Sequence, residues 1–185
     1  VLAKLGLVFV NGGSWNGEQI VSRYWVNAST SKVVFNLGAF GPLTELHARL
    51  TGEQRDFEAV TRETRELIAR DTLGSEVSRL TATFVDICEN QRRFRDYTRH
   101  ELNQAIRAVA ASMPVYRTYV RPFEHFTSDG DLRVIEQAVA TAREARPDID
   151  PELLDFLGDI LSLRIDGPAE AELAGRFQQF TGAVM

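Results

Sequence analysis

Helix-start signals recur along the second half of the sequence, and they constrain the fold more than any other feature. Thr98 is followed by Glu101, the pattern of a capping box in which each residue bonds the backbone N–H of the other. Similar signals occur at Ser128 or Asp129, at Asp150 with Pro151, and at Pro168. Apolar residues at helical spacing follow each signal. The sequence therefore predicts helices that begin near residues 99, 129, 151 and 168.

A longer helical stretch is predicted upstream of these signals, from about Gln54 to Phe94. Its apolar positions recur at helical spacing, first at Phe57, Val60, Thr64, Leu67 and Ile68, and then at Val77, Leu80, Phe84, Ile87 and Cys88. Gly74 lies between the two runs and predicts a break or a close packing point. A shorter amphipathic helix is expected over residues 43–50, and we expect the chain to be mainly α-helical.

The first 41 residues have a different composition. "NGGSWNGEQ" and "NASTSK" are rich in glycine, asparagine and serine, which is typical of turns. "IVSRYWV" and "KVVFNLGAF" are rich in residues that favour β-strands, and each predicts a short strand. The sequence therefore predicts a β- and turn-rich segment over residues 1–41 and a helical part over residues 42–185.

One stretch within the helical part, "MPVYRTYV" (Met113 to Val120), breaks the helical period. Pro114 is expected to end the preceding helix because proline lacks the backbone N–H and clashes with the previous turn. The valines, tyrosines and threonine that follow favour a β-strand. An isolated strand needs a neighbour for its backbone groups. We therefore predict a short strand here whose sheet lies elsewhere.

Composition limits the classes of function. The 185 residues carry a formal net charge of -5, and such an acidic balance argues against a dedicated nucleic-acid binder. The single cysteine, Cys88, rules out an internal disulfide and fits a reducing compartment such as the cytoplasm. No apolar run approaches the roughly 20 residues that cross a bilayer, so no membrane segment is expected. Both ends are expected to be cuts through a longer protein.

Most residues with reactive side chains are expected to have structural roles. His47, His100 and His125 lack the spacing of metal ligands. Cys88 lies on an apolar helix face, and a small buried side chain is a simpler interpretation than a nucleophile. The carboxylate pairs Asp148/Asp150, Asp155/Asp159 and Glu170/Glu172 lie in helix caps or on polar helix faces. We therefore predict no catalytic residue, metal site or cofactor in this sequence.

An arginine cluster lies in "NQRRFRDYTRH", where Arg92, Arg93, Arg95 and Arg99 surround two aromatic residues. Arginines with aromatic neighbours can bind phosphates or single-stranded nucleic acid. Arginines near a helix C-terminus also stabilise its carbonyl groups and dipole. The cluster thus leaves open an alternative function, an autonomous helical module that binds an acidic partner or nucleic acid through Arg92–Arg99.

The "VYRTY" stretch also permits two interpretations. In the structural one, Arg117 is buried and paired to an acid, with Tyr116 and Tyr119 on the opposite face of the strand. In the functional one, Tyr116, Arg117 and Tyr119 bind a sugar. Tyrosines offer apolar rings with hydroxyls and arginine offers several N–H donors, which suit the CH faces and hydroxyls of a saccharide.

Several stretches together resemble one enzyme family, the maltooligosyltrehalose synthases. "MPVYRTYVRP" resembles their Phe-Pro-Val-Tyr-Arg-Thr-Tyr motif, and the segment from Glu152 to Met185 is similar to the one that precedes their Met-Ala-Lys-Gly-Val-Glu-Asp-Thr run. "GPLTELHARLTG" and "SEVSRLTATFVDICENQRRFRDYTRHEL" resemble the helices before these motifs. The resemblance covers roughly Gly41 to Met185, with the motifs in the same order.

The resemblance implies a helical insertion subdomain of a (β/α)8-barrel enzyme of the α-amylase-like clan, with one or a few short strands. Such enzymes are cytoplasmic isomerases of trehalose synthesis that need no cofactor. They convert the reducing-end α-1,4 bond of a malto-oligosaccharide to an α,α-1,1 bond. By the resemblance, Tyr116, Arg117 and Tyr119 contact this substrate.

The family's catalytic carboxylates have no matching position in this chain. Its nucleophile and acid/base lie on barrel strands N-terminal to the matched region, and a third acid lies beyond Met185. Residues 1–40 also lack the Gly-Thr-Thr-Gly-Tyr run that the family has before these helices. The chain is therefore expected to be a fragment that is inactive by itself.

Overall fold

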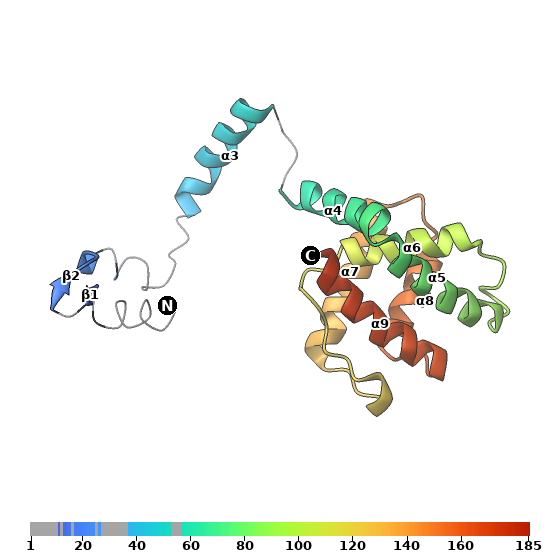
Figure 1. The fold of residues 1–185 in the computed structure, drawn as a ribbon. Coiled ribbons are helices and arrows are strands. Elements are labelled where there is room, and N and C mark those ends of the chain that lie inside the picture. The colour runs from blue at the N-terminus through green and yellow to red at the C-terminus, as the bar shows by residue number, and fades with distance from the viewer. Residues whose placement is uncertain (1–10, 12, 16, 25, 27–36, 53–56) are drawn as a thin grey trace. The chain divides into compact units, whose positions relative to one another are not determined.

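The computed structural model describes residues 11, 13–15, 17–24, 26, 37–52 and 57–185 (Figure 1). Two compact units make up the chain, Val1–Gln54 and Arg55–Met185. The described residues are mainly helical, which confirms the predicted mainly α class. None of the described helices is both long enough and apolar enough to span a membrane.

The described residues of the unit Val1–Gln54 include a small hairpin and a long helix. Strands β1 (Ser14–Trp15) and β2 (Glu18–Gln19) pair antiparallel. Gly17, between them, has a φ of 84°, a conformation that favours glycine. Helix α3 (Leu37–Thr51) ends at Gly52, whose φ is 74° and whose N–H bonds the carbonyl of Ala48 at 2.9 Å. This is the usual glycine stop of a helix.

Two predictions about this unit need correction. The strand predicted over "IVSRYWV" is wrong, because residues 23, 24 and 26 are helical and the hairpin lies in the turn-like stretch just before them. The strand predicted over "KVVFNLGAF" is wrong for residues 37–40, which belong to α3, while residues 32–36 lie outside the described part. β-Branched and aromatic residues favour strands only where their side chains can pack on neighbouring strands of a sheet. The helix predicted over residues 43–50 is confirmed within the longer α3.

The unit Arg55–Met185 is a bundle of helices joined by short connections (Figure 1). In chain order these are α4 (Phe57–Leu67), a π-helical turn (Ile68–Thr72), α5 (Gly74–Glu89), α6 (Arg99–Ala111), a 3₁₀ turn (Pro122–Glu124), α7 (Asp129–Ala145), α8 (Pro151–Leu161) and α9 (Pro168–Val184). The long helix predicted from Gln54 to Phe94 is therefore interrupted before Gly74, as the glycine indicated, and it ends at Glu89 rather than Phe94.

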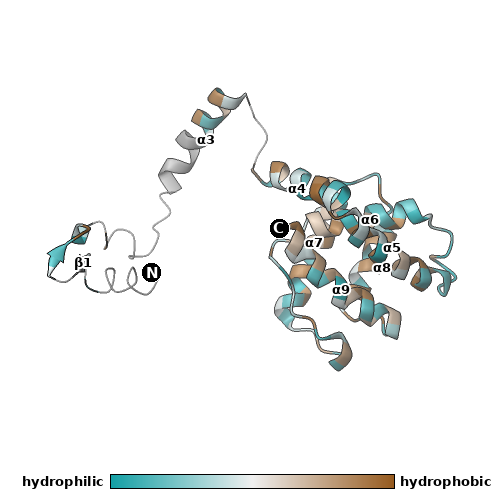
Figure 2. Ribbon diagram, viewed as in Figure 1, coloured by the Kyte–Doolittle hydropathy of each residue, from teal (hydrophilic) through white to brown (hydrophobic). Residues whose placement is uncertain are grey.

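Helix α6 is the centre of this bundle. It packs against α4, α5, α7, α8 and α9. Its residues from Ala105 to Ala111 are all buried, and most of them are alanines, whose small side chains let neighbouring helices approach. Around it, Phe156 of α8 stacks on Phe84 with 5.9 Å between ring centroids and on Phe94 with 3.8 Å. Figure 2 shows that the helices carry both hydrophobic and hydrophilic residues, as expected around a shared core.

The predicted helix starts are confirmed in atomic detail. The hydroxyl of Thr98 accepts a bond from the N–H of Glu101, and the Glu101 carboxylate accepts one from the N–H of Thr98 at 2.7 Å. Ser128 rather than Asp129 caps α7, by accepting from the N–H of Asp131 at 3.1 Å. Pro151 and Pro168 open α8 and α9. These starts were predictable because a cap needs only residues within one turn of each other.

The strand predicted over Met113 to Val120 is wrong. These residues form bends followed by a stretch without regular secondary structure, and no strand among the described residues pairs with them. Two backbone groups bond to helix side chains instead, the N–H of Tyr119 to Asp131 at 2.9 Å and the carbonyl of Val120 to Gln178 at 3.0 Å. An isolated bridge between Arg121 and Phe126 follows. Side chains of helices thus satisfy backbone groups that a sheet was expected to satisfy.

The carboxylate of Asp150 is expected to make the stability of the folded state depend on pH. Its carboxylate accepts bonds from the hydroxyl of Tyr97 at 2.5 Å and from the N–H of Glu152 at 2.9 Å, and both lower the pKa of Asp150. A carboxyl whose pKa is lower in the folded state contributes stability above its unfolded pKa of about 3.9 and loses it as the pH falls through the folded pKa.

Asp150→Asn keeps a capping side chain but removes this charge. We expect the variant to be less stable than the wild type at pH 6, and the difference to shrink as the pH falls from about 5 to 2.5. Urea unfolding at each pH measures it. Asp86→Asn, on the exposed face of α5, controls for removal of a charge. A difference that stays constant over this range contradicts the role of the Asp150 charge.

Candidate functional site

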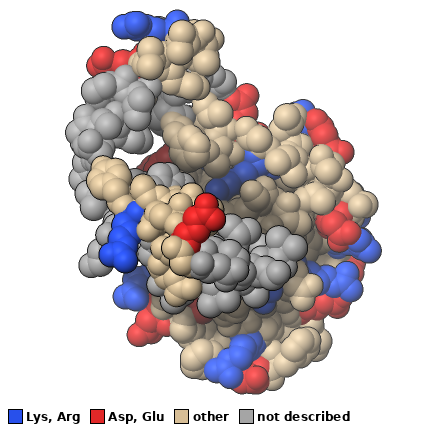
Figure 3. All heavy atoms as spheres, turned by 60° about the vertical axis from the view of Figure 1, so that its left-hand side comes forward, with Lys and Arg blue, Asp and Glu red and all other residues tan. Residues whose placement is uncertain are grey.

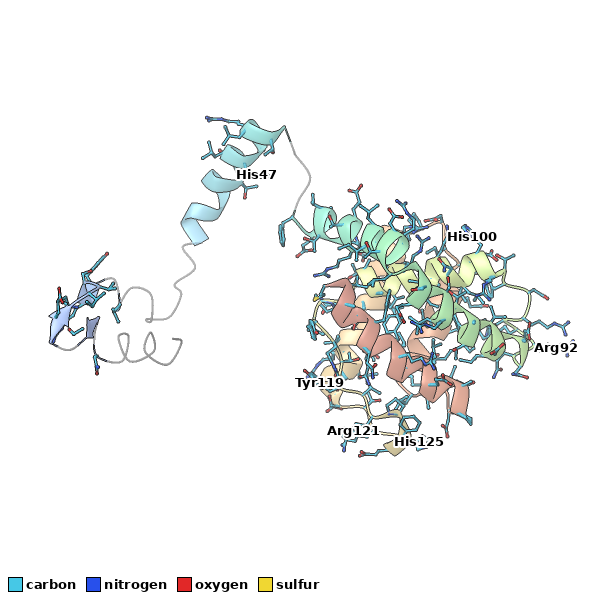
Figure 4. The ribbon with its side chains drawn as sticks, in the orientation of Figure 1. His47, Arg92, His100, Tyr119, Arg121 and His125 are labelled. Atoms are coloured by element: carbon cyan, nitrogen blue, oxygen red, sulfur yellow. The ribbon has the colours of Figure 1, made fainter. Side chains whose placement is uncertain are left out.

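The predicted site residues all lie in the connection between α6 and α7, which we call the aromatic segment (residues 113–126). Tyr116 and Tyr119 are 61% and 68% exposed. The guanidinium carbon of Arg117 lies 4.8 Å from the ring centroid of Tyr119, which is a cation–π contact. Tyr119, Arg121 and His125 lie on the same side of the helical bundle (Figure 4). The structure therefore brings Arg117 and Tyr119 together and presents both tyrosines to solvent.

The structural interpretation of Arg117 is wrong. Arg117 is half-buried and pairs with no acid in the part of the chain that the structure describes. Its Nε atom is buried without a hydrogen-bond partner there. Arg117 also contacts the Tyr119 ring rather than lying on the opposite face from it. A guanidinium held against an aromatic ring keeps N–H donors for a further acceptor.

Helix α9 holds one side of the aromatic segment. Gln178 donates to the carbonyl of Val120, while Tyr116 lies against Gly182 and Pro122 lies near Gly175. Residues 175, 178 and 182 are three and four apart, so they lie on one face of the helix. The segment therefore runs along α9 in the opposite direction to the helix. Small residues at both ends of this face leave room for Tyr116 and Pro122.

Helix α7 holds the other side. The Asp131 carboxylate accepts bonds from the N–H of Tyr119 at 2.9 Å and from the hydroxyl of Ser128 at 2.6 Å. Thr118 and Val120 are buried, whereas Tyr119 and Arg121 are exposed. Burial thus alternates along residues 118–121, as it does in a strand, but the buried residues face helices instead of a second sheet layer.

Arg65 of α4 fixes the start of the segment. Its Nη1 donates to the carbonyls of Ala111 and Met113, at 3.4 and 2.8 Å. The last carbonyls of a helix lack partners within the helix, so this arginine caps α6. Burial lowers the pKa of Arg65.

A second ring–arginine pair, which was not predicted from the sequence, lies at the end of the aromatic segment. The guanidinium carbon of Arg121 lies 4.2 Å from the ring centroid of Phe126. Their backbones exchange bonds of 2.9 and 3.2 Å around a tight turn in which His125 has a φ of 49°. The sequence signal for this pair is the run of aromatic and basic residues in "RPFEHF".

Exposed apolar side chains concentrate on the aromatic segment. Within the described residues of Arg55–Met185, the large hydrophobic side chains that are exposed are Phe57, Leu67, Val115, Tyr116, Tyr119, Phe123, Phe126 and Met185, and most of them belong to this segment. Clustered exposed apolar groups mark binding surfaces more often than scattered ones do. The segment is therefore the leading candidate for a binding site.

The Arg92–Arg99 cluster is largely engaged within the protein. Arg92 is exposed. Arg93 forms an ion pair with Glu152, and Arg95 lies 3.8 Å from the Asp96 carboxylate. Arg99 donates a hydrogen bond to the carbonyl of Ser78 at 3.2 Å. On the face drawn in Figure 3, acidic and basic side chains lie next to one another and form no broad field of one sign. A phosphate-binding surface needs basic excess. Arg92 also lies far from Tyr119 in Figure 4.

The other reactive side chains occupy structural positions. His47, His100 and His125 are exposed, and no group of three or more potential metal ligands occurs among the described residues. Cys88 is buried, and burial raises the pKa of its thiol to about 12, which suppresses the thiolate needed for nucleophilic attack. Asp155, Asp159 and Glu172 form ion pairs with arginines, and Asp148 pairs with Arg146.

No family model, curated protein or solved structure matches this chain. The geometry of the aromatic segment and the motif resemblance are therefore the two observations that bear on function.

Gly182 allows a direct test of how Tyr116 is positioned. An alanine Cβ at residue 182 would lie 2.9 Å from Cζ and 3.0 Å from the hydroxyl oxygen of Tyr116. Because these atoms are the tip of an exposed side chain, we expect Gly182→Ala to displace the ring and leave the helix intact. The NMR resonances of the Tyr116 ring measure the displacement.

Gly175→Ala is the matched control on the same helix face. Its Cβ would meet only Pro122, at an ordinary distance of 3.8 Å. This variant should gain up to about 1 kcal/mol from helix propensity and leave Tyr116 in place. If Gly182→Ala leaves the Tyr116 resonances unchanged, the contact between Gly182 and Tyr116 does not position the ring.

Proposed function

We propose that this chain belongs to a maltooligosyltrehalose-synthase-like enzyme, in which the unit Arg55–Met185 is a helical insertion of a (β/α)8 barrel. In this proposal Tyr116, Arg117 and Tyr119 contact the malto-oligosaccharide. The supporting observation is that two tyrosine rings are exposed on a segment whose backbone α7 and α9 hold in place. The order of motifs across Gly41 to Met185 supports the choice of family.

The chemistry of the segment suits a saccharide. An aromatic ring packs against the CH face of a sugar, and a neighbouring arginine donates hydrogen bonds to hydroxyls. Arg117 lies over the Tyr119 ring, so an apolar surface and a set of donors occur side by side. Tyr116 adds a second ring, which is seated on Gly182. Because the backbone is held before a ligand arrives, less conformational entropy is lost on binding.

The proposal assigns binding rather than bond rearrangement to this unit. Moving a glucosyl bond with retention needs a nucleophilic carboxylate and an acid/base carboxylate about 5 Å apart across the bond. The acids of the described unit that the sequence analysis singled out, such as Asp150 and Asp155, serve in a helix cap and an ion pair. The catalytic carboxylates are therefore assigned to parts of the enzyme that Gly41 to Met185 does not match. In this proposal the enzyme uses no cofactor and acts in the cytoplasm.

The alternative, a module that binds an acidic partner or nucleic acid through Arg92–Arg99, has less support. Two of its four arginines pair with acids of the same chain, Arg93 with Glu152 and Arg95 with Asp96. Salt-dependent binding to a phosphate backbone would favour this alternative over the saccharide proposal.

Tyr119→Ala tests the proposed function. Titration of the chain with maltohexaose, followed by NMR, should show binding that the variant weakens roughly 2- to 10-fold, the range expected for loss of one aromatic contact. Tyr119→Phe should have a smaller effect because it keeps the ring. Tyr24→Ala removes another exposed tyrosine, from the other unit, and should not change binding.

Cellohexaose, which has β-1,4 bonds, controls for non-specific sugar binding. If the wild-type chain binds maltohexaose no better than cellohexaose, or if Tyr119→Ala binds as well as Tyr24→Ala, the proposed site is wrong.

A further inference from the structure

We infer that the saccharide-binding surface continues past Tyr119 onto Phe123 and Phe126, so that the aromatic segment binds a linear oligosaccharide over two ring–arginine platforms. We call Arg117 with Tyr119 the first platform, and Arg121 with Phe126 and the adjacent Phe123 the second platform. This inference rests on the proposed function, because it extends the same surface to a longer ligand.

The exposure of the second platform is the first argument. Phe123 is 87% exposed and Phe126 is 45% exposed. A phenylalanine left in water lacks the stabilisation that burial of its ring would provide. Such exposure is expected where a ligand covers the rings in the working state.

The repetition of one contact is the second argument. Arg117 lies 4.8 Å from the Tyr119 ring centroid, and Arg121 lies 4.2 Å from the Phe126 ring centroid. Each pair places N–H donors beside an aromatic ring. A glucan offers the matching pattern along its length, since every sugar unit has an apolar CH face and hydroxyl groups. Repeated platforms therefore suit a repeating ligand.

The direction of the segment is the third argument. Tyr116 lies at Gly182 and Pro122 at Gly175, so the backbone between them, which carries Arg117, Tyr119 and Arg121, runs along the axis of α9. The two glycines are separated by roughly 10 Å along the helix. An elongated ligand can span this distance, whereas a compact one would contact a single platform.

The second platform is also held in place. The bridge between Arg121 and Phe126 closes its turn, and the imidazole Nδ1 of His125 lies 3.3 Å from the Asp166 carboxylate. Arg121 is further paired with Glu124. A platform fixed before binding keeps the entropy cost of association low.

Titration with a short and a long saccharide separates the two platforms. Isothermal titration of the 185-residue chain uses maltotriose and maltoheptaose as probes. We expect Phe123→Ala to weaken maltoheptaose binding roughly 2- to 10-fold and to leave maltotriose binding unchanged, whereas Tyr119→Ala weakens both. Phe57→Ala is the matched control, because Phe57 is 79% exposed but lies on α4.

Each contrary outcome identifies what fails. If Tyr119→Ala weakens both saccharides while Phe123→Ala weakens neither, the second platform does not bind saccharide and the proposed function stands. If the wild-type chain binds neither saccharide, the proposed function fails and this inference fails with it. If Phe123→Ala instead abolishes a concentration-dependent dimer seen by sedimentation, without changing saccharide binding, the surface joins two copies of the chain and the inference is wrong.

Discussion

The aromatic segment depends on hydrogen bonds from helix side chains to a backbone that has no strand beside it. The N–H of Tyr119 bonds to Asp131 of α7, and the carbonyl of Val120 bonds to Gln178 of α9. The bond to the Val120 carbonyl is buried, and a buried backbone group without a partner costs about 1–3 kcal/mol, so Gln178 stabilises the segment where it lies. Gly182 and Gly175 provide the space beside α9. Without these contacts, Tyr116 and Tyr119 would be rings on an unsupported loop.

Holding the backbone in this way also determines which side chains face outward. Burial alternates along the stretch from Thr118 to Arg121, and the helices bury Thr118 and Val120. Tyr119 and Arg121 must then face solvent. The same constraint that completes the fold therefore produces the exposed platforms on which the saccharide proposal rests.

Local chemistry made the helix starts predictable. The Thr98–Glu101 box and the caps at Ser128 and Asp150 involve residues within one turn of each other, so their effect differs little between folds. The strands were predicted less well. Residues 20–26 and 113–120 have strand-forming composition, but β-propensity depends on the surface that receives the side chains, and here helices or solvent receive them. Of the candidate site, the sequence indicated Tyr116, Arg117 and Tyr119 but not Phe123 or Phe126.

The sequence by itself determined that the larger part of this protein is helical, where its helices begin, and that Cys88 is buried, because periodicity and capping act over a few neighbouring residues. Only the tertiary structure decided that Arg93 pairs with Glu152, that Arg117 stacks on Tyr119 instead of pairing with an acid, and that Tyr116 rests on Gly182. Arg93 with Glu152 and Tyr116 with Gly182 join residues far apart in the chain. Arg117 pairs with no acid among the residues that the structure describes. These partners are chosen by the packing of whole helices, which no local pattern encodes.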